Sequence, residues 1–330
     1  MRTGKELILA SRPYAQEQRL VSWWHLGSTL LILAALITVA CIASPWYLYV
    51  PAGILSGMVL VRLFIIYHDY MHGTIFRDSR VAGWILRGYG MVALSPPSIW
   101  KHSHDDHHKN NCKTFGTALG SFPILTTEDY ANFSFWQRVG YIVARHPLII
   151  GFGYITSFFV SMSLVPFLTN AREHYGAGLS ILVHVSIAVC LAMISLQALV
   201  WGFLVPMIIA GALGSYLFYA QHNFPDIKRR HGDDWDYVFA ALHSSSFMRM
   251  GRLMSWFTGN IGYHHVHHLN AKIPFYRLPE AMEGIKELQS PPTTSLHPVD
   301  VMRCLRLKLW DPASEKMLTF REATRVSRAA

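Results

Sequence analysis

Long stretches without a charged side chain place the strongest constraint on the fold of this 330-residue chain. Residues 26–44 and 179–219 carry no charged side chain, and residues 46–67 are interrupted only by Arg62. A helix rises about 1.5 Å per residue, so roughly 20 apolar residues cross the roughly 30 Å of hydrocarbon in a bilayer. The chain is 52% hydrophobic and only 15% charged, a composition typical of a membrane protein. We therefore predict an all-α integral membrane protein.

Eight histidines fall in three short motifs, two of which share the spacing His-x-x-His-His. On a helix, residues at i, i+3 and i+4 lie on one face, so each motif directs its imidazoles the same way. The motifs contain His68 and His72; His104, His107 and His108; and His264, His267 and His268. Imidazole binds iron, copper, nickel and zinc, and eight ligands exceed the four of a tetrahedral zinc site. We therefore predict that two metal ions share these histidines.

Four membrane crossings keep the three motifs on one side of the membrane. Gly202 and Pro206 lie near the middle of residues 179–219, which indicates a hairpin of two helices. The predicted crossings are residues 26–44, 46–67, 179–198 and 202–219, arranged as two hairpins. The apolar residues 147–168 are expected to be re-entrant or to lie in the interface, because a fifth crossing would separate the motifs. The alternative pairs a crossing by residues 147–168 with one long crossing through 179–219.

The basic residues indicate which side this is. Of the 29 Lys and Arg, 4 precede the first crossing, 8 lie between residues 77 and 145, and 15 follow residue 220. The positive-inside rule then places both termini and all three motifs in the cytoplasm, and no nucleic-acid partner is needed to explain the net charge of +9. We expect a single domain over residues 1–330. It has a basic N-terminal segment (1–25), a membrane region (26–219) with a cytoplasmic loop (68–146), and a cytoplasmic helical cap and tail (220–330).

Other polar residues are expected to support the metal ligands. His222 follows the last crossing at the level of the motifs and is the ninth candidate ligand. Ligating imidazoles commonly donate their second N–H to a carboxylate or carbonyl, for which Asp69, Asp105, Asp106, Asn223 and Asp226 are candidates. His102 and His265 break the helical spacing and are expected either to support the ligands from behind or to be structural. Arg62 is expected to extend toward the same surface.

The motifs and their surroundings resemble the membrane fatty acid desaturase family, in particular its bacterial acyl-lipid branch with the Δ12 and Δ5 enzymes. The resemblance rests on His-Asp-Tyr-Met-His-Gly at 68–73, Ser-His-Asp-Asp-His-His at 103–108, Gln-His-Asn-Phe at 221–224, and the stretch 256–276 around the third motif. It covers most of the chain from about residue 60 onward.

The resemblance implies a non-haem di-iron centre, O2 as co-substrate, and electrons from a ferredoxin or a cytochrome b5. The sequence contains no His-Pro-Gly-Gly haem-binding motif, so the donor is expected to be a separate protein. The expected reaction places a cis double bond in a fatty acyl chain of a membrane lipid, in the bacterial inner membrane. Candidate walls of an acyl tunnel are Phe64, Tyr67, Trp100, Tyr216, Tyr219 and Trp256.

Two alternatives remain open at this point. The same motifs occur in hydroxylases and ketolases that act on alkyl lipids or carotenoids. A histidine-rich metal transporter would need ligands distributed through its membrane spans, whereas only His184 lies within a predicted crossing.

Overall fold

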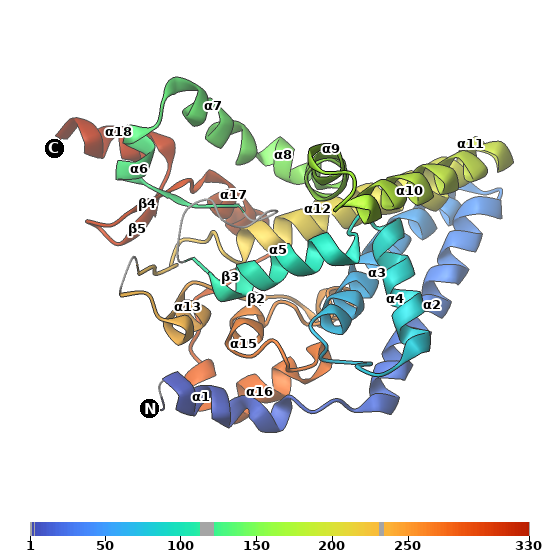
Figure 1. Ribbon diagram of the computed structural model, residues 1–330, viewed down its shortest axis with the longest axis horizontal. Coiled ribbons are helices and arrows are strands. Elements are labelled where there is room, and N and C mark those ends of the chain that lie inside the picture. Colours follow the sequence, from blue (N-terminus) through green and yellow to red (C-terminus); the bar gives the residue numbers. More distant parts are fainter. Residues whose placement is uncertain (1, 3, 113–121, 231–233, 330) are drawn as a thin grey trace.

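The computed structural model of the chain describes residues 2, 4–112, 122–230 and 234–329. Within these ranges, four helices are long and apolar enough to cross a membrane. They are α2 (Arg19–Ile42), α3 (Trp46–Met71), α10 (Tyr175–Ile194), and a continuous helix formed by α11 (Leu196–Leu199), η3 (Val200–Leu204) and α12 (Val205–Ala220). Figure 1 shows α2, α10 and α11 reaching one end of the molecule and both chain termini at the other. The prediction of a mainly helical fold with four spanning helices is confirmed.

The second hairpin turns at Ser195, whereas the sequence predicted a break at residues 199–201. The Ser195 backbone is extended, and its Oγ accepts a hydrogen bond from Ala198 N at 3.0 Å, which caps the following helix. Gln197 Nε2 donates to the carbonyl oxygens of Ala40 and Ala43 at 3.1 and 2.8 Å. The turn is therefore held against the end of α2.

Gly202 and Pro206 lie inside the helix and do not break it. Gly202 packs against Cys41 of α2 so closely that a Cβ would collide with the sulfur. Pro206 follows the π-helical segment η3, whose wider turn relieves the clash between a proline ring and the preceding turn. The predicted boundary was wrong because these two residues serve packing and a local π turn.

Residues 147–168 form a series of short helices: α8 (Pro147–Gly151), the π-helical η2 (Tyr154–Leu164) and α9 (Val165–Thr169). The apolar helix Tyr154–Thr169 is shorter than the four spans and packs against α10 and α12. Figure 1 shows α9 nearly end-on, whereas α10 and α12 lie along the picture. This crosswise course favours the expected interfacial or re-entrant path. The single long crossing through 179–219 is not observed.

The cap, defined here as the described residues of 97–144 and 221–329, consists of short elements. Its helices are α5 (Pro97–Lys109), α6 (Thr127–Asn132), α7 (Phe135–Ala144), α13 (Tyr237–His243), α14 (Arg252–Phe257), α15 (His264–Leu269), η5 (Phe275–Arg277), α16 (Leu278–Gly284), η6 (Lys286–Leu288), α17 (Pro298–Arg306) and α18 (Phe320–Ala329). Strand β4 (Leu309–Asp311) pairs in parallel with β1 (Leu125–Thr126) and antiparallel with β5 (Lys316–Leu318), while β2 (Phe247–Arg249) and β3 (Thr293–Ser295) pair in parallel. The two parallel ladders join cap segments that are far apart in sequence.

The basic N-terminal segment packs on this cap. It forms α1 (Gly4–Ser11) and the 3-10 turn η1 (Arg12–Tyr14). Arg2 forms an ion pair with Glu287 at 2.9 Å, and Arg277 Nη1 donates to the carbonyl oxygens of Pro13 and Gln16 at 3.0 and 3.3 Å. These contacts fasten the N-terminal segment to η5 and η6 of the cap.

Arg62 does not extend to the surface as expected. Its residue surface is only 2% exposed, and its guanidinium lies over the ring of Trp256 at 4.4 Å. Nε donates to Thr29 Oγ1 at 3.1 Å, and Nη2 lies 2.9 Å from His25 Nδ1. Burial of this cation is thus accompanied by hydrogen bonds and a cation–π contact, as its desolvation requires.

Candidate metal centre

All nine predicted ligands are buried near helix ends or on short helices, with 9% of their surface or less exposed. The last turn of α3 and its C-cap residue carry the first motif, α5 carries the second, and α15 carries the third. His222 follows the end of α12 directly. The helical conformation of these segments directs the side chains of each motif inward from a different element.

The nine side chains form two groups, and within each group the nitrogens available to a metal lie within 4.8 Å of one another. Five residues form the first group: His68, His72, His104, His108 and His267. Four form the second: His107, His222, His264 and His268. Nε2 of His108 lies 3.0 Å from Nε2 of His267, and Nε2 of His222 lies 2.9 Å from Nε2 of His264. The sequence-predicted set therefore converges on two neighbouring points.

The motifs are divided between the groups. His107 joins the second group although its neighbours in α5 belong to the first, and His267 joins the first although the rest of its motif belongs to the second. The rings of His108 and His268 stack with centroids 4.4 Å apart across the boundary. Helices α5 and α15 therefore each contribute histidines to both groups, and this shared support fixes the distance between the two groups.

Buried nitrogens without a hydrogen-bond partner show that the histidine groups are suited to bind metal ions. Nε2 of His72 and Nε2 of His107 are buried and have no hydrogen-bond partner among the described residues. Each atom belongs to a different group. A buried polar atom without a partner costs about 1–3 kcal/mol, and coordination to a cation would satisfy it.

Burial also keeps these imidazoles neutral, the form that binds metal. It lowers the pKa of the His72 imidazole well below the usual 6.5, and positive charge on neighbouring histidines would lower it further. The same two causes lower the pKa of His104, His107, His108, His264, His267 and His268. Burial brings the pKa of His222 to about 4. At neutral pH these rings therefore retain a free lone pair.

Two residues fix the orientation of individual candidate ligands. Asp69 Oδ1 lies 3.0 Å from His68 Nδ1, and Asp69 Oδ2 accepts a hydrogen bond from Phe275 N at 2.7 Å. The carbonyl oxygen of Ser244 lies 3.1 Å from His222 Nδ1. Because these oxygens accept, Nδ1 carries the proton in both histidines, and Nε2 is left for a metal.

Asp69 is the one predicted supporting residue for which a histidine contact is described. Asp105 pairs with Lys101 at 2.7 Å, and Asp106 accepts from Asn110 at 2.8 Å. Of the two histidines expected to be structural, His102 is exposed and His265 lies 3.1 Å from the carbonyl oxygen of Leu288. Within the spans, His184 bonds to Tyr154 and to the Val92 carbonyl, and does not join either group.

A buried arginine that the sequence did not reveal braces the segment after His222. Arg145 is 1% exposed and donates from Nη2 to Tyr219 Oη at 3.2 Å and to Asn223 Oδ1. Asn223 Nδ2 in turn donates to the Cys304 carbonyl at 2.6 Å. The only signal in the sequence was Asn223 itself, which follows the ninth candidate ligand.

An apolar cavity of about 120 Å³ ends at the histidines. His68, His104, His107 and His264 line it at the metal groups, and Phe64, Trp100, Phe158 and Met162 are among its apolar walls. A smaller cavity of about 40 Å³ shares Val61, Phe64, Phe158 and Gly214 with the first. Both cavities lie between the spans and can hold an apolar chain.

Only two of the six predicted tunnel walls, Phe64 and Trp100, line the larger cavity. Tyr67 Oη donates to the Ser95 carbonyl at 2.8 Å, Tyr219 Oη donates to the Leu307 carbonyl at 3.1 Å, and Trp256 packs under Arg62. Tyr216 is only partly buried and packs against the core. The residues that the prediction missed, such as Phe158 and Gly214, carry no signal in the sequence beyond lying in apolar runs.

Comparison with known proteins shows which family the chain resembles. The model of a family described as fatty acid desaturase matches residues 44–297. The chain is 33% identical over 275 residues to a fatty acid desaturase of Bacillus subtilis (strain 168), covering 81% of this chain and 76% of that protein. It is 27% identical over 279 residues to an sn-1 oleoyl-lipid 12-desaturase of Synechocystis, covering 80% and 76%. It is 24% identical over 287 residues to an sn-1 acyl-lipid omega-3 desaturase (ferredoxin) of Nostoc, covering 80% and 75%.

Proposed function

Because the chain belongs to the fatty acid desaturase family, we propose that it introduces a cis double bond, in an oxygen-dependent reaction, into a fatty acyl chain of a membrane lipid. The observation that carries this proposal is the apolar cavity between the spans, which ends at the two histidine groups. The names of relatives that act on acyl-lipid and oleoyl-lipid substrates support a lipid-bound chain.

The residues of the cavity position the acyl chain. Phe64, Phe158 and Met162 offer apolar contacts to an acyl chain, and the cavity lining is mainly apolar. Gly214 leaves room where the two cavities share their walls. A methylene pair held at the histidine end is thereby presented to the metal groups, while the rest of the chain stays in an apolar environment.

The two histidine groups fit two iron ions, one held by His68, His72, His104, His108 and His267 and the other by His107, His222, His264 and His268. Bound there, iron would activate O2 for the removal of hydrogen from unactivated carbon, which ordinary acid–base side chains cannot perform. Asp69 and the Ser244 carbonyl hold His68 and His222 in the tautomer that directs Nε2 inward. The two hydrogens removed, two electrons and two protons combine with one O2 to give two water molecules.

The electrons come from a separate protein of the ferredoxin or cytochrome b5 type. The Nostoc relative carries ferredoxin in its name, which supports this assignment. We place the enzyme in the bacterial inner membrane with its termini and histidine groups in the cytoplasm, where the basic residues concentrate.

Replacement of one ligand tests the metal assignment. His107→Ala leaves three imidazoles in the second group. Iron bound per purified chain should fall from about two ions to about one, because a site that loses a ligand retains metal poorly. His102→Ala is the matched control, since His102 is an exposed histidine on the same helix. Equal iron in both variants, measured by elemental analysis, would refute the assignment of His107 as a ligand.

A further inference from the structure

A basic groove separate from the acyl cavity reaches the first histidine group. It has a volume of about 510 Å³ and is lined by His72 together with Tyr70, Arg77, Arg87, Ser98 and Lys101, among others. None of its lining residues also lines the larger apolar cavity. The first histidine group therefore has an opening toward solvent that an acyl chain in the cavity leaves free.

The charges of the groove have one sign. Arg77, Arg87 and Lys101 are exposed, and no carboxylate belongs to the described lining. Lys272 lies beside them and donates from Nζ to the carbonyl oxygen of His72. Through this contact Lys272 adds a fourth cation to the side of the groove on which His72 lies.

Nearby acids offset this charge only in part. Asp105 pairs with Lys101 at 2.7 Å, but it is not part of the groove lining. The cations surround the rim of the groove, with His72 in its wall. A cluster of one sign over a concave surface attracts a partner of the opposite sign and speeds its association.

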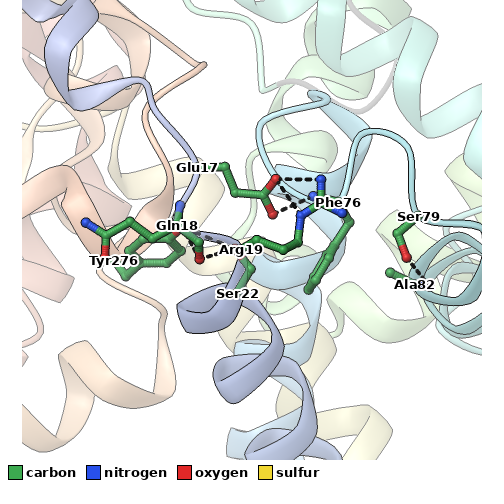
Figure 2. Close-up of polar contacts among 8 residues, drawn as sticks. All are labelled: Glu17, Gln18, Arg19, Ser22, Phe76, Ser79, Ala82 and Tyr276. Carbon is green, nitrogen blue, oxygen red and sulfur yellow. Dashed lines mark hydrogen bonds and ion pairs between the residues drawn. The ribbon is translucent and has the colours of Figure 1, made fainter.

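The loop that carries Arg77 is held in place. Glu17 Oε1 accepts a hydrogen bond from Phe76 N at 2.8 Å, and Glu17 also pairs with Arg19 at 3.0 Å, as Figure 2 shows. Ser79 Oγ accepts from Ala82 N at 3.2 Å and caps α4 (Arg80–Val92), which carries Arg87. The groove is thus a preformed surface, as a docking site for a folded partner requires.

We propose that this groove, formed by Arg77, Arg87, Lys101 and Lys272 around His72, is the docking surface for an acidic one-electron carrier protein. The proposal rests on the proposed desaturase function, whose balance requires two electrons, delivered by two reduced carriers in succession. Each carrier is oxidised by one electron, and with two protons the electrons complete the reduction of O2 to water. Docking over His72 brings the carrier to the first histidine group from the side that the acyl chain does not occupy.

A lipid headgroup would also be attracted by these cations, but the observations favour the protein carrier. The larger cavity, which would hold the acyl chain of the lipid, shares no described lining residue with the groove. The groove also exposes the edge of a group that must receive electrons. These two facts separate the path of the acyl chain from the path of the electrons.

Binding of a [2Fe–2S] ferredoxin to the full chain in nanodiscs tests the proposal. The double variant Arg77→Gln/Arg87→Gln should raise the Kd of the oxidised ferredoxin by about tenfold at low salt and flatten its dependence on ionic strength. The control Arg321→Gln/Arg325→Gln removes the same charge from α18 and should leave the Kd within about twofold of wild type, because screening weakens distant charges. Under anaerobic conditions, reduced ferredoxin should reduce the iron-loaded double variant more slowly than wild type, whereas reduced methyl viologen should reduce both at the same rate.

Equal ferredoxin binding by the double variant and the control would overturn the proposal. So would a loss of product from lipid substrate in the double variant with ferredoxin binding unchanged, since the groove would then serve the headgroup. Binding of the oxidised carrier needs no turnover. It therefore tests the groove even if wild type forms no unsaturated product, a result that would instead count against the proposed function.

Discussion

At the scale of single residues, the positions of the candidate ligands followed from the sequence, but their division into two groups did not. The i, i+3, i+4 spacing predicted that the motifs would direct imidazoles one way, and all nine candidates do converge. His107 and His267 belong to the group opposite that of their neighbours because of how the histidines of α5 and α15 pack together. That packing is a tertiary feature of the cap, which no local sequence pattern records.

Asp69 provides a prediction at this scale. Asp69→Ala removes the acceptor for both His68 Nδ1 and Phe275 N. Loss of such a supporting carboxylate typically weakens metal binding by about 10–100-fold, so iron affinity should fall by that amount. The measurement is competition with a chelator, with Asp226→Ala, an exposed carboxylate, as the control. If Asp69→Ala lost its iron only at the same chelator concentration as wild type, this role of Asp69 would be refuted.

At the scale of elements, the long uncharged runs predicted the four spanning helices. The assumption that Gly202 and Pro206 break a helix put one helix boundary in the wrong place. The run from 179 to 219 was divided at Gly202, because a break was expected where helix formers are absent. In the structure, glycines of α3 lie against the other hairpin. A Cβ on Gly57 would lie 2.7 Å from Ile209 Cβ and 2.9 Å from the Pro206 carbonyl oxygen. Close approach of helices, rather than chain reversal, accounts for these residues.

Gly57→Ala should therefore destabilise the protein. Its Cβ would meet the backbone of the neighbouring helix, and overpacking of this kind costs about 1–3 kcal/mol. Gly27→Ala on α2 is the control, because a Cβ there meets nothing within 4 Å. Thermal unfolding in detergent should show a lower midpoint for Gly57→Ala than for Gly27→Ala. Coincident midpoints would show that the α3–α12 approach is looser than described.

At the scale of the whole molecule, four spans bring both termini to one end, where the N-terminal segment contacts the cap. The ion pair of Arg2 with Glu287 and the hydrogen bonds of Arg277 to the N-terminal segment hold α1 against the cap. The sequence indicated only that the N-terminal segment is basic. Its docking could not be foreseen, because the partner residues lie more than 250 positions away.

Cysteine labelling tests the proposed topology. In a variant without the four native cysteines, Met193→Cys at the far end of α10 and Arg321→Cys on α18 present exposed thiols at opposite ends of the molecule. A membrane-impermeant maleimide added to intact cells should label Met193→Cys alone. Arg321→Cys should react only after permeabilisation, because the positive-inside rule places α18 in the cytoplasm. Labelling of both from outside would refute the four-crossing arrangement.

The most direct test of the central claim is analysis of fatty acids by gas chromatography and mass spectrometry. A bacterial host that lacks polyunsaturated lipids would express the wild-type chain or His107→Ala together with a ferredoxin, and be fed saturated and monounsaturated acids. We predict a new unsaturated acid that appears with wild type only in the presence of O2, and that is absent with His107→Ala. An oxygenated product in place of a new double bond, or the same unsaturated acid from both proteins, would contradict the account.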